Sequence, residues 1–227
     1  MEIIEAIRSR RSIRSFKPDP VPRQVLEELL DACRWAPSGG NAQPWHFAVL
    51  GGKEMARVAA RLEEVGRASW DGTLFTDMKP DFRRRGAYPE LLMSRVETQR
   101  ERMNSVFSAG GEDLEQKRNE FMFKMLRFFD APSAIILYTD DSSPTAVLDI
   151  GIVTQTICLA ALAYGLGTCI MGYPVMWPDI LRELLGIPSG KPIATSIAIG
   201  YPDPDAAINT FSRPRERLDV LADWHWL

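Results

Sequence analysis

Apolar residues recur along this chain at two spacings, one typical of helices and one typical of strands. Ile3, Ile4 and Ile7 follow helical spacing in the stretch "EIIEAIRSR". The stretch 21–36 predicts a second helix, with Pro22 in its first turn and an apolar stripe formed by Val25, Leu29, Ala32 and Cys33. Further helices are expected over 53–68, 91–107, 114–129, 145–164 and 179–190.

Short apolar runs that end at turn-forming residues predict strands. They cover 46–52, 133–140, 168–172 and 192–202. Because helices and strands are mixed without strict alternation, the pattern predicts an α+β fold with one core sheet and helices around it. We find no internal repeat, so the expected organisation is one domain over 1–227, with an arginine-rich polar excursion at about 66–127.

One segment is apolar enough that a membrane-spanning helix has to be considered as an alternative to a buried helix. From Ile150 to Pro178 there is no charged residue, a length that could cross a bilayer. Thr154 and Gln155 interrupt the segment, and Gly165 follows near its middle. A helix over 145–164 that stops at Gly165 fits this pattern better, and an almost wholly apolar helix is expected in a core or a subunit interface.

Composition and charge narrow the functional classes. The net charge of −3 argues against a nucleic-acid partner, since phosphate neutralisation requires a basic surface. Cys33, Cys158 and Cys169 are scattered and odd in number, which favours reduced thiols in a cytoplasmic protein. With His46 and His225 as the only histidines, no metal centre is expected. The acidic start of the chain, which has no apolar core segment, does not read as a secretory signal.

The stretch "RSRRSIRSF" holds Arg8, Arg10, Arg11 and Arg14 within seven residues. The helical pattern fades near Arg10, and residues two apart in an extended chain point the same way, so Arg10, Ser12 and Arg14 share one face. Two guanidinium groups and a hydroxyl suit a phosphate monoester. The alternative is a set of arginines that cap the helix or remain solvated at the surface.

A second stretch, "WAPSGGNAQPWHF", lies directly between a predicted helix and a predicted strand. Its glycines and prolines let backbone amides approach a flat ligand closely, while Ser38, Asn41 and Gln43 offer hydrogen bonds. Considered alone, the stretch is equally well explained as an elaborate loop without a ligand.

Together, "RRSIRSF" and "APSGGNAQPWHF", about 25 residues apart, resemble the nitroreductase family of FMN-dependent, NAD(P)H-oxidising flavoproteins. The stretch "GIVTQTICLAALAYGLGTCIMGYP" is similar to the long central helix and flavin-contacting turn of that family. "IAIGYPDPDAA" and "SRPRERL" are similar to its last strand and its C-terminal basic motif. The resemblance covers roughly 1–60 and 130–217. It implies a central mixed or antiparallel sheet flanked by helices, in an intertwined homodimer with FMN at the interface.

The resemblance also implies roles at the phosphate end of the flavin. Arg10, Ser12 and Arg14 are expected to hold the phosphate and the ribityl chain of FMN. Arg213 and Arg215 belong to the closing motif, and either could complete the phosphate socket.

Other residues are implied at the ring system. Arg11 is expected to adjoin the isoalloxazine edge, and the backbone N–H groups of Met171 and Gly172 to approach flavin N5. The front loop is expected to serve the flavin of the other subunit, through Pro37, Ser38 and Gly39, with Asn41 and Gln43 in the same loop. The family commonly has a mid-chain flavin-contacting Asn, and neither Asn104 nor Asn119 has a supporting motif.

The implied activity is an FMN-dependent oxidoreductase that takes hydride from NADH or NADPH and reduces a small aromatic acceptor, such as a nitroaromatic or a quinone, in ping-pong fashion. The sequence contains no dinucleotide fingerprint, phosphate-binding loop, hydrolase elbow or metal-spaced cluster, as expected where a cofactor carries the chemistry. Alternatives are a reductive dehalogenase, an enone reductase or a flavin-fragmenting enzyme of the same fold, and a non-catalytic flavin-binding module. The excursion either covers the substrate or embraces a partner subunit.

Overall fold

The computed structural model describes residues 2–82, 88–109 and 113–226. In this part of the chain, four strands form one antiparallel sheet in the order β1-β2-β4-β3. The strands are β1 Trp45–Gly51, β2 Ser133–Thr139, β3 Gly167–Met171 and β4 Ile193–Gly200. All four predicted strands are confirmed, and the sheet is purely antiparallel rather than mixed.

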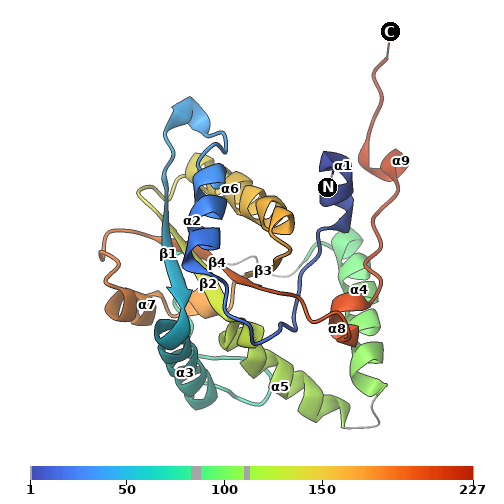
Figure 1. Cartoon of the computed structure of the whole chain (residues 1–227). Coiled ribbons are helices and arrows are strands. Elements are labelled where there is room, and N and C mark those ends of the chain that lie inside the picture. Colours follow the sequence, from blue (N-terminus) through green and yellow to red (C-terminus); the bar gives the residue numbers. More distant parts are fainter. Residues whose placement is uncertain (1, 83–87, 110–112, 227) are drawn as a thin grey trace.

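Helices cover both faces of this sheet (Figure 1). One face packs against α2, Arg23–Cys33, and α6, Pro144–Ala163, whereas the other packs against α3, Gly52–Ala68, and α7, Pro178–Leu185. Successive side chains of the central strand β2 therefore enter different cores: Ile135 and Leu137 on the first face, Ile136 on the second. Because both faces are covered, β2 is apolar without alternation.

The buried stripe of α2 differs from the predicted one. Leu26, Leu29 and Cys33 are buried, whereas Val25 is only partly buried and Ala32 is exposed. The rotation of the helix is determined by its contact with α6 and the sheet, and this contact brings Leu26 inward in place of the smaller alanine.

The apolar helix α6 is confirmed nearly to the residue, and it ends before Gly165, which has a φ of 68°. By length and composition α6 could cross a membrane. In this fold, however, Ile150, Val153 and Ile157 are buried against the sheet and α2. The opposite face of α6 is exposed, with Leu148 65% accessible.

The excursion contains two paired helices, α4 Glu90–Ser108 and α5 Leu114–Leu126, as predicted. The two helices are in contact through the aromatic rings of Phe107 and Phe121, whose centroids are 5.3 Å apart. The base of the excursion is tied to the sheet, because the carboxylate of Asp81 pairs with Arg182 and accepts a 2.7 Å hydrogen bond from the Ile193 N–H.

The two ends of the chain lie on the outside of the fold. Helix α1, Ile3–Ser9, has no buried residue. Beyond β4, where no periodicity was visible, the chain forms two short helices, α8 Ala207–Thr210 and α9 Leu218–Leu221, and the tail then extends away from the sheet (Figure 1). Three short 3-10 turns, Gly39–Asn41, Phe128–Asp130 and Pro174–Met176, connect the larger elements.

Candidate functional site

The arginine-rich segment after α1 is extended and lies alongside β3. Ser12 forms a parallel bridge with Thr168, and the Ile13 N–H donates to the Thr168 carbonyl at 2.9 Å. Ile13 is buried against Gly167, where a Cβ atom would lie only 2.5 Å from Ile13 Cγ1. The glycine therefore allows the close approach, and the apolar anchor at Ile13 leaves the flanking arginines beside the edge of the sheet.

A buried asparagine near the C-terminus holds this segment in place. The Asn209 side-chain carbonyl accepts hydrogen bonds from the N–H groups of Arg14, at 2.7 Å, and Ser15, at 3.2 Å. Its amide group donates to the carbonyls of Ser15, at 2.8 Å, and Asp203, at 2.9 Å. Asn209 is only 4% exposed, so these four bonds satisfy its amide and fix the backbone at Arg14.

Arg213 joins the segment from the same C-terminal region. Its Nη2 donates to the carbonyls of Ser12, at 2.9 Å, and Ile208, at 3.3 Å, and its guanidinium lies 4.4 Å from the centre of the Phe211 ring. Arg11 donates from Nη2 to the Phe211 carbonyl at 2.8 Å. The C-terminal segment therefore contacts the arginine-rich segment through both backbone and side chains.

Several nitrogen atoms of this cluster are buried without a hydrogen-bond partner in the described structure. They are Nη1 of Arg14, and Nε and Nη1 of Arg213. Burial, followed by the neighbouring charges of Arg14, Arg11 and Arg10, lowers the pKa of Arg213 to about 10. Unpaired buried donors and mutual repulsion are both costly, and an anion with several oxygens relieves both. The cluster is therefore suited to a phosphate group.

Arginines of this cluster line two separate cavities. The first, of about 590 Å³, is lined by Arg10, Arg11, Arg213 and Arg215, together with the end of α1. The second, of about 500 Å³, is lined by Arg14 and by the end of β3. The structure thus divides the predicted arginine face, with Arg10 in one cavity and Arg14 in the next. Arg213 lies in the cluster itself, whereas Arg215 is exposed and donates to the Arg213 and Pro214 carbonyls.

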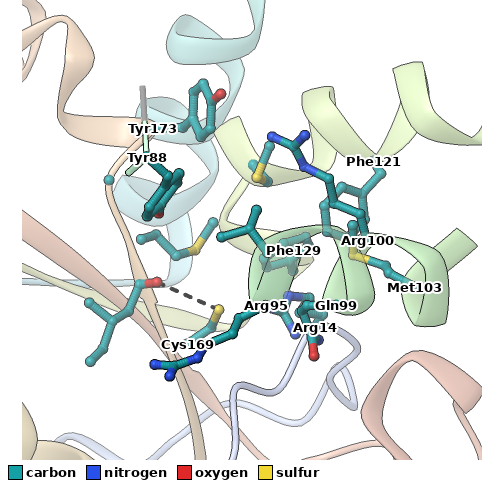
Figure 2. Close-up of a pocket in the computed structure, with 15 residues that line it drawn as sticks. Arg14, Tyr88, Arg95, Gln99, Arg100, Met103, Phe121, Phe129, Cys169 and Tyr173 are labelled. Carbon is teal, nitrogen blue, oxygen red and sulfur yellow. Dashed lines mark hydrogen bonds between the residues drawn. The ribbon is translucent and has the colours of Figure 1, made fainter. Parts of the chain in front are cut away.

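The floor of the second cavity comes from β3 and the turn that follows it, and its walls come from the excursion (Figure 2). The floor residues are Cys169, Ile170, Met171, Gly172 and Tyr173. The walls are formed by Tyr88, by Arg95, Val96, Gln99, Arg100 and Met103 of α4, and by Phe121, Met125 and Phe129. The cavity is therefore flanked by aromatic, methionine and arginine side chains, a lining suited to a flat ring with polar substituents.

Cys169 is the thiol in this floor. It is 4% exposed, and its Sγ donates a weak hydrogen bond to the Ile170 carbonyl at 3.8 Å, which is the dashed line at Cys169 in Figure 2. Burial is the largest effect and raises the pKa of the Cys169 thiol, outweighing the opposing charges of Arg14 and Arg213. The thiol is consequently protonated near neutral pH, which is consistent with a packing role rather than a nucleophilic one.

Strained backbone supports Phe129 beside this cavity. Phe128, Phe129 and Asp130 all have a positive φ, between 56° and 57°. Left-handed conformations cost about 1–3 kcal/mol each for residues other than glycine. Arg127 stabilises the turn through ion pairs with Asp130 at 2.9 Å and with Glu63 at 2.8 Å.

The front loop lies apart from the arginines within one chain. Its Gly39 N–H donates to the buried Asp149 carboxylate, at 3.1 Å to Oδ1, near the N-terminal end of α6. Arg10, in contrast, lies near Cys158 of the same helix, where burial raises the pKa of the thiol and the positive charge of Arg10 opposes that larger effect. Cys158 follows Asp149 by nine residues, which is about 13 Å along the helix axis. None of the loop residues Pro37, Ser38, Gly39, Asn41 and Gln43 lines either cavity described above.

The loop itself is tightly organised. The Gln43 N–H donates to Ser38 Oγ at 2.9 Å, and the Gln43 side chain donates to the Asn41 carbonyl at 3.1 Å. Asn41 and Gln43 have a φ of 56° and 48°, which is unusual for residues other than glycine. Strain of this kind is found where a loop is shaped for binding.

A family model described as "Nitroreductase family" matches residues 7–201. The chain belongs to the nitroreductase family. Among its relatives are a chloronitrobenzene nitroreductase of Comamonas testosteroni, 29% identical over 96% of this chain and 94% of that protein, and a 4-nitrobenzoate reductase of a Nocardioides species, 30% identical over 100% and 91%. The crystal structure of the FMN-dependent nitroreductase NfnB from Mycobacterium smegmatis, in complex with NADPH, superposes with a TM-score of 0.89 at 27% identity, covering 98% of this chain and 97% of that one.

In this nitroreductase-family chain, sequence reasoning found the arginines but missed Asn209 and Phe129. Asn209 lies in a stretch without periodicity, and its partners are 194 and 195 residues away along the chain. For Phe129 the repeated "FF" before Asp130 was the only local signal, and it was interpreted as the end of a helix. The structure ends α5 at Leu126 because the next residues turn into the left-handed region.

Proposed function

We propose that this protein is an FMN-dependent oxidoreductase that oxidises NADH or NADPH and reduces a small aromatic acceptor, such as a nitroaromatic or a quinone. Family membership and the FMN- and NADPH-dependent relative support the cofactors. The observation that carries the proposal is a guanidinium cluster with buried, unpaired nitrogen atoms beside a cavity lined by aromatic residues. FMN combines a phosphate with a flat ring system, which are the two chemistries that these regions suit.

At the phosphate end, Arg10, Ser12, Arg14 and Arg213 would hold the FMN phosphate and the ribityl chain. The unpaired donors of Arg14 and Arg213 support this assignment, because a bound phosphate gives them acceptors. Arg215 is the weaker candidate, since it is exposed and its Nη1 already donates to backbone carbonyls.

At the ring end, Met171 and Gly172 would lie under the isoalloxazine, and Arg11 would adjoin its edge. When bound, FMN supplies hydride acceptance and donation. The protein binds and orients the rings against the β3 turn, excludes water with Phe121 and Phe129, and places positive charge where reduction adds negative charge. With the isoalloxazine seated against the β3 turn, a cavity of about 500 Å³ would leave space for one further planar molecule at a time, which supports ping-pong alternation of nicotinamide and acceptor.

The chain would act as a homodimer in which the front loop serves the partner's flavin. In support, Pro37, Ser38, Gly39, Asn41 and Gln43 belong to a strained loop remote from the arginines of their own chain. Large apolar side chains are also exposed on α1, on α6 and beside the loop: Ile3, Ile4, Ile7, Val147, Leu148 and Trp35. Exposed apolar area on this scale is typical of a protein interface.

The remaining assignments concern the organisation of the chain. We treat 1–227 as a single domain in which the excursion at about 66–127 covers the active site, because its helices wall the cavity above β3. A cytoplasmic location is supported by three free, buried cysteines. No nucleic-acid or membrane partner is proposed.

The absorption spectrum of the purified protein tests the function. The preparation is expected to be yellow, with flavin bands that bleach anaerobically on addition of NADH or NADPH and return on addition of nitrobenzene or a quinone. A colourless protein that acquires no bands with added FMN would rule out the flavin site. A flavin-containing protein that no nicotinamide bleaches would be a non-catalytic binding module.

A further inference from the structure

One face of α4 forms a wall of the cavity above β3. Val96, Gln99, Arg100 and Met103 have the spacing of a single helical stripe, and all four line the cavity. A face that only packed a core would be apolar, yet this one carries an amide and a guanidinium. The polar positions on this face are therefore available to a ligand.

Arg100 is the unneutralised charge on that face. It forms no ion pair with any residue in the described part of the chain, although Glu97 lies three residues earlier, at a spacing that often gives a pair. Its neighbour Arg95 differs, because Arg95 Nε lies 2.9 Å from a carboxylate oxygen of Glu216. Arg100 is exposed at the mouth of this cavity, and no Asp or Glu is among the described residues lining it, so an anion bound in the cavity would be the partner of the Arg100 charge.

We propose that Arg100 binds a negatively charged substituent of the aromatic acceptor, so that this enzyme favours anionic aromatics such as nitro-substituted benzoates over neutral ones. The inference rests on the proposed oxidoreductase function and narrows its substrate class. Arg100 shares its cavity with Phe121 and Phe129, which suit the ring, while the guanidinium suits a carboxylate.

The acceptor is a better source of this anion than the nicotinamide substrate. The carboxylate of 4-nitrobenzoate is separated from its nitro group by one benzene ring, so both fit within a cavity of about 500 Å³. The extra phosphate of NADPH is separated from the nicotinamide by two riboses and a pyrophosphate, which places it beyond a cavity of that size.

The test compares Arg100→Met with Arg102→Met in the flavin-loaded enzyme. Arg102 lies on the same helix, is exposed like Arg100 and carries the same charge, but it does not line the cavity, which makes it a matched control. Steady-state kcat/KM is measured for 4-nitrobenzoate and for nitrobenzene at saturating NADPH, and the ratio of the two values is the readout. Arg100→Met is expected to lower this ratio about 10- to 100-fold, which is the value of a charge-assisted hydrogen bond.

Two further variants and a salt titration serve as controls. Arg102→Met is expected to leave the ratio unchanged, Arg100→Lys to retain part of it, and added salt to lower it in the wild type. An unchanged ratio in Arg100→Met would overturn the proposal. A fall in kcat/KM for NADPH but not for NADH, with the acceptor ratio unchanged, would assign the anion to the nicotinamide substrate and also overturn it. A wild-type protein without flavin or NAD(P)H oxidation would instead refute the proposed function.

Discussion

Arg14 and Arg213 place like charges in a partly buried region where three of their nitrogen atoms lack hydrogen-bond partners in the described structure. The lowered pKa of Arg213 has the sign expected for this arrangement, because burial and the charges of Arg14 and Arg11 disfavour its protonated form. Without a bound anion, the repulsion between these charges and their unpaired donors destabilise the cluster. Binding a phosphate therefore gains both new hydrogen bonds and relief of repulsion.

Substituting Arg14 tests this argument at the residue scale. Arg14→Ala removes an unpaired donor of the cluster, and we expect FMN affinity to fall about 10- to 100-fold, corresponding to about 1.5–3 kcal/mol. Equilibrium dialysis with FMN measures the affinity, and far-ultraviolet circular dichroism checks the fold. Arg34→Ala, which removes only an exposed ion pair with Asp31, is the control and should retain wild-type affinity. Equal affinities in the two variants would remove Arg14 from the flavin site.

At the scale of elements, the walls of the cavity depend on how the excursion packs against the rest of the fold. Helix α5 packs on α3, and Gly66 of α3 lies directly against Leu126 of α5. A Cβ atom there would lie 2.1 Å from Leu126 Cδ1 and 3.3 Å from Phe75 Cε1, and both neighbours are fully buried. The glycine therefore sets the distance between the two helices, and with it the position of Phe121 and Phe129.

Gly66→Ala is expected to destabilise the protein. Crowding in a packed core costs about 1–3 kcal/mol, and the better helix propensity of alanine recovers about 1 kcal/mol at most. Urea unfolding of the flavin-free protein measures the difference. Gly190→Ala is the control, because nothing lies within 4 Å of a Cβ at that position, and a change within about 0.5 kcal/mol is expected. If Gly66→Ala unfolds at the wild-type urea concentration or above it, α3 and α5 are less closely packed than described.

At the scale of the whole molecule, the two motifs proposed to bind flavin lie apart within one chain. The arginines lie beside β3, whereas the strained front loop lies near the N-terminal end of α6. The exposed apolar residues of α1 and α6 offer a surface across which a second copy can bring its loop to the first copy's arginines. The proposed dimer would therefore complete the proposed site as well as cover apolar area.

Leu148→Glu tests the dimer. This side chain is 65% exposed on α6, so a charge there is tolerated in a single chain but not in an apolar interface. We expect a monomer with little bound flavin, measured by size-exclusion chromatography with light scattering and by the flavin-to-protein absorbance ratio. Leu74→Glu, 51% exposed in the excursion, is the control and should remain dimeric. A monomeric wild type that retains FMN would contradict the proposed interface.

The sequence by itself determined the identity and order of the elements. The helices α1, α2 and α3 have side-chain periods that repeat within a few residues, whereas α6 and the four strands are apolar runs that end at turn-forming residues, and both kinds of signal can be read from local sequence. The paired front motifs were also readable, because each is a continuous run of unusual residues. The secondary-structure signals and the two motifs each lie within a short stretch of sequence, so they can be recognised without knowledge of the fold.

Only the tertiary structure decided which residues meet. It turned Leu26 rather than Ala32 inward on α2, brought Asn209 to the backbone of Arg14, and put Arg213 rather than Arg215 into the buried cluster. It also divided Arg10 and Arg14 between two cavities. These outcomes depend on contacts between segments up to 201 residues apart, such as that of Arg213 with Ser12. No short-range pattern encodes such contacts, because they arise when the sheet and its covering helices close around a common core.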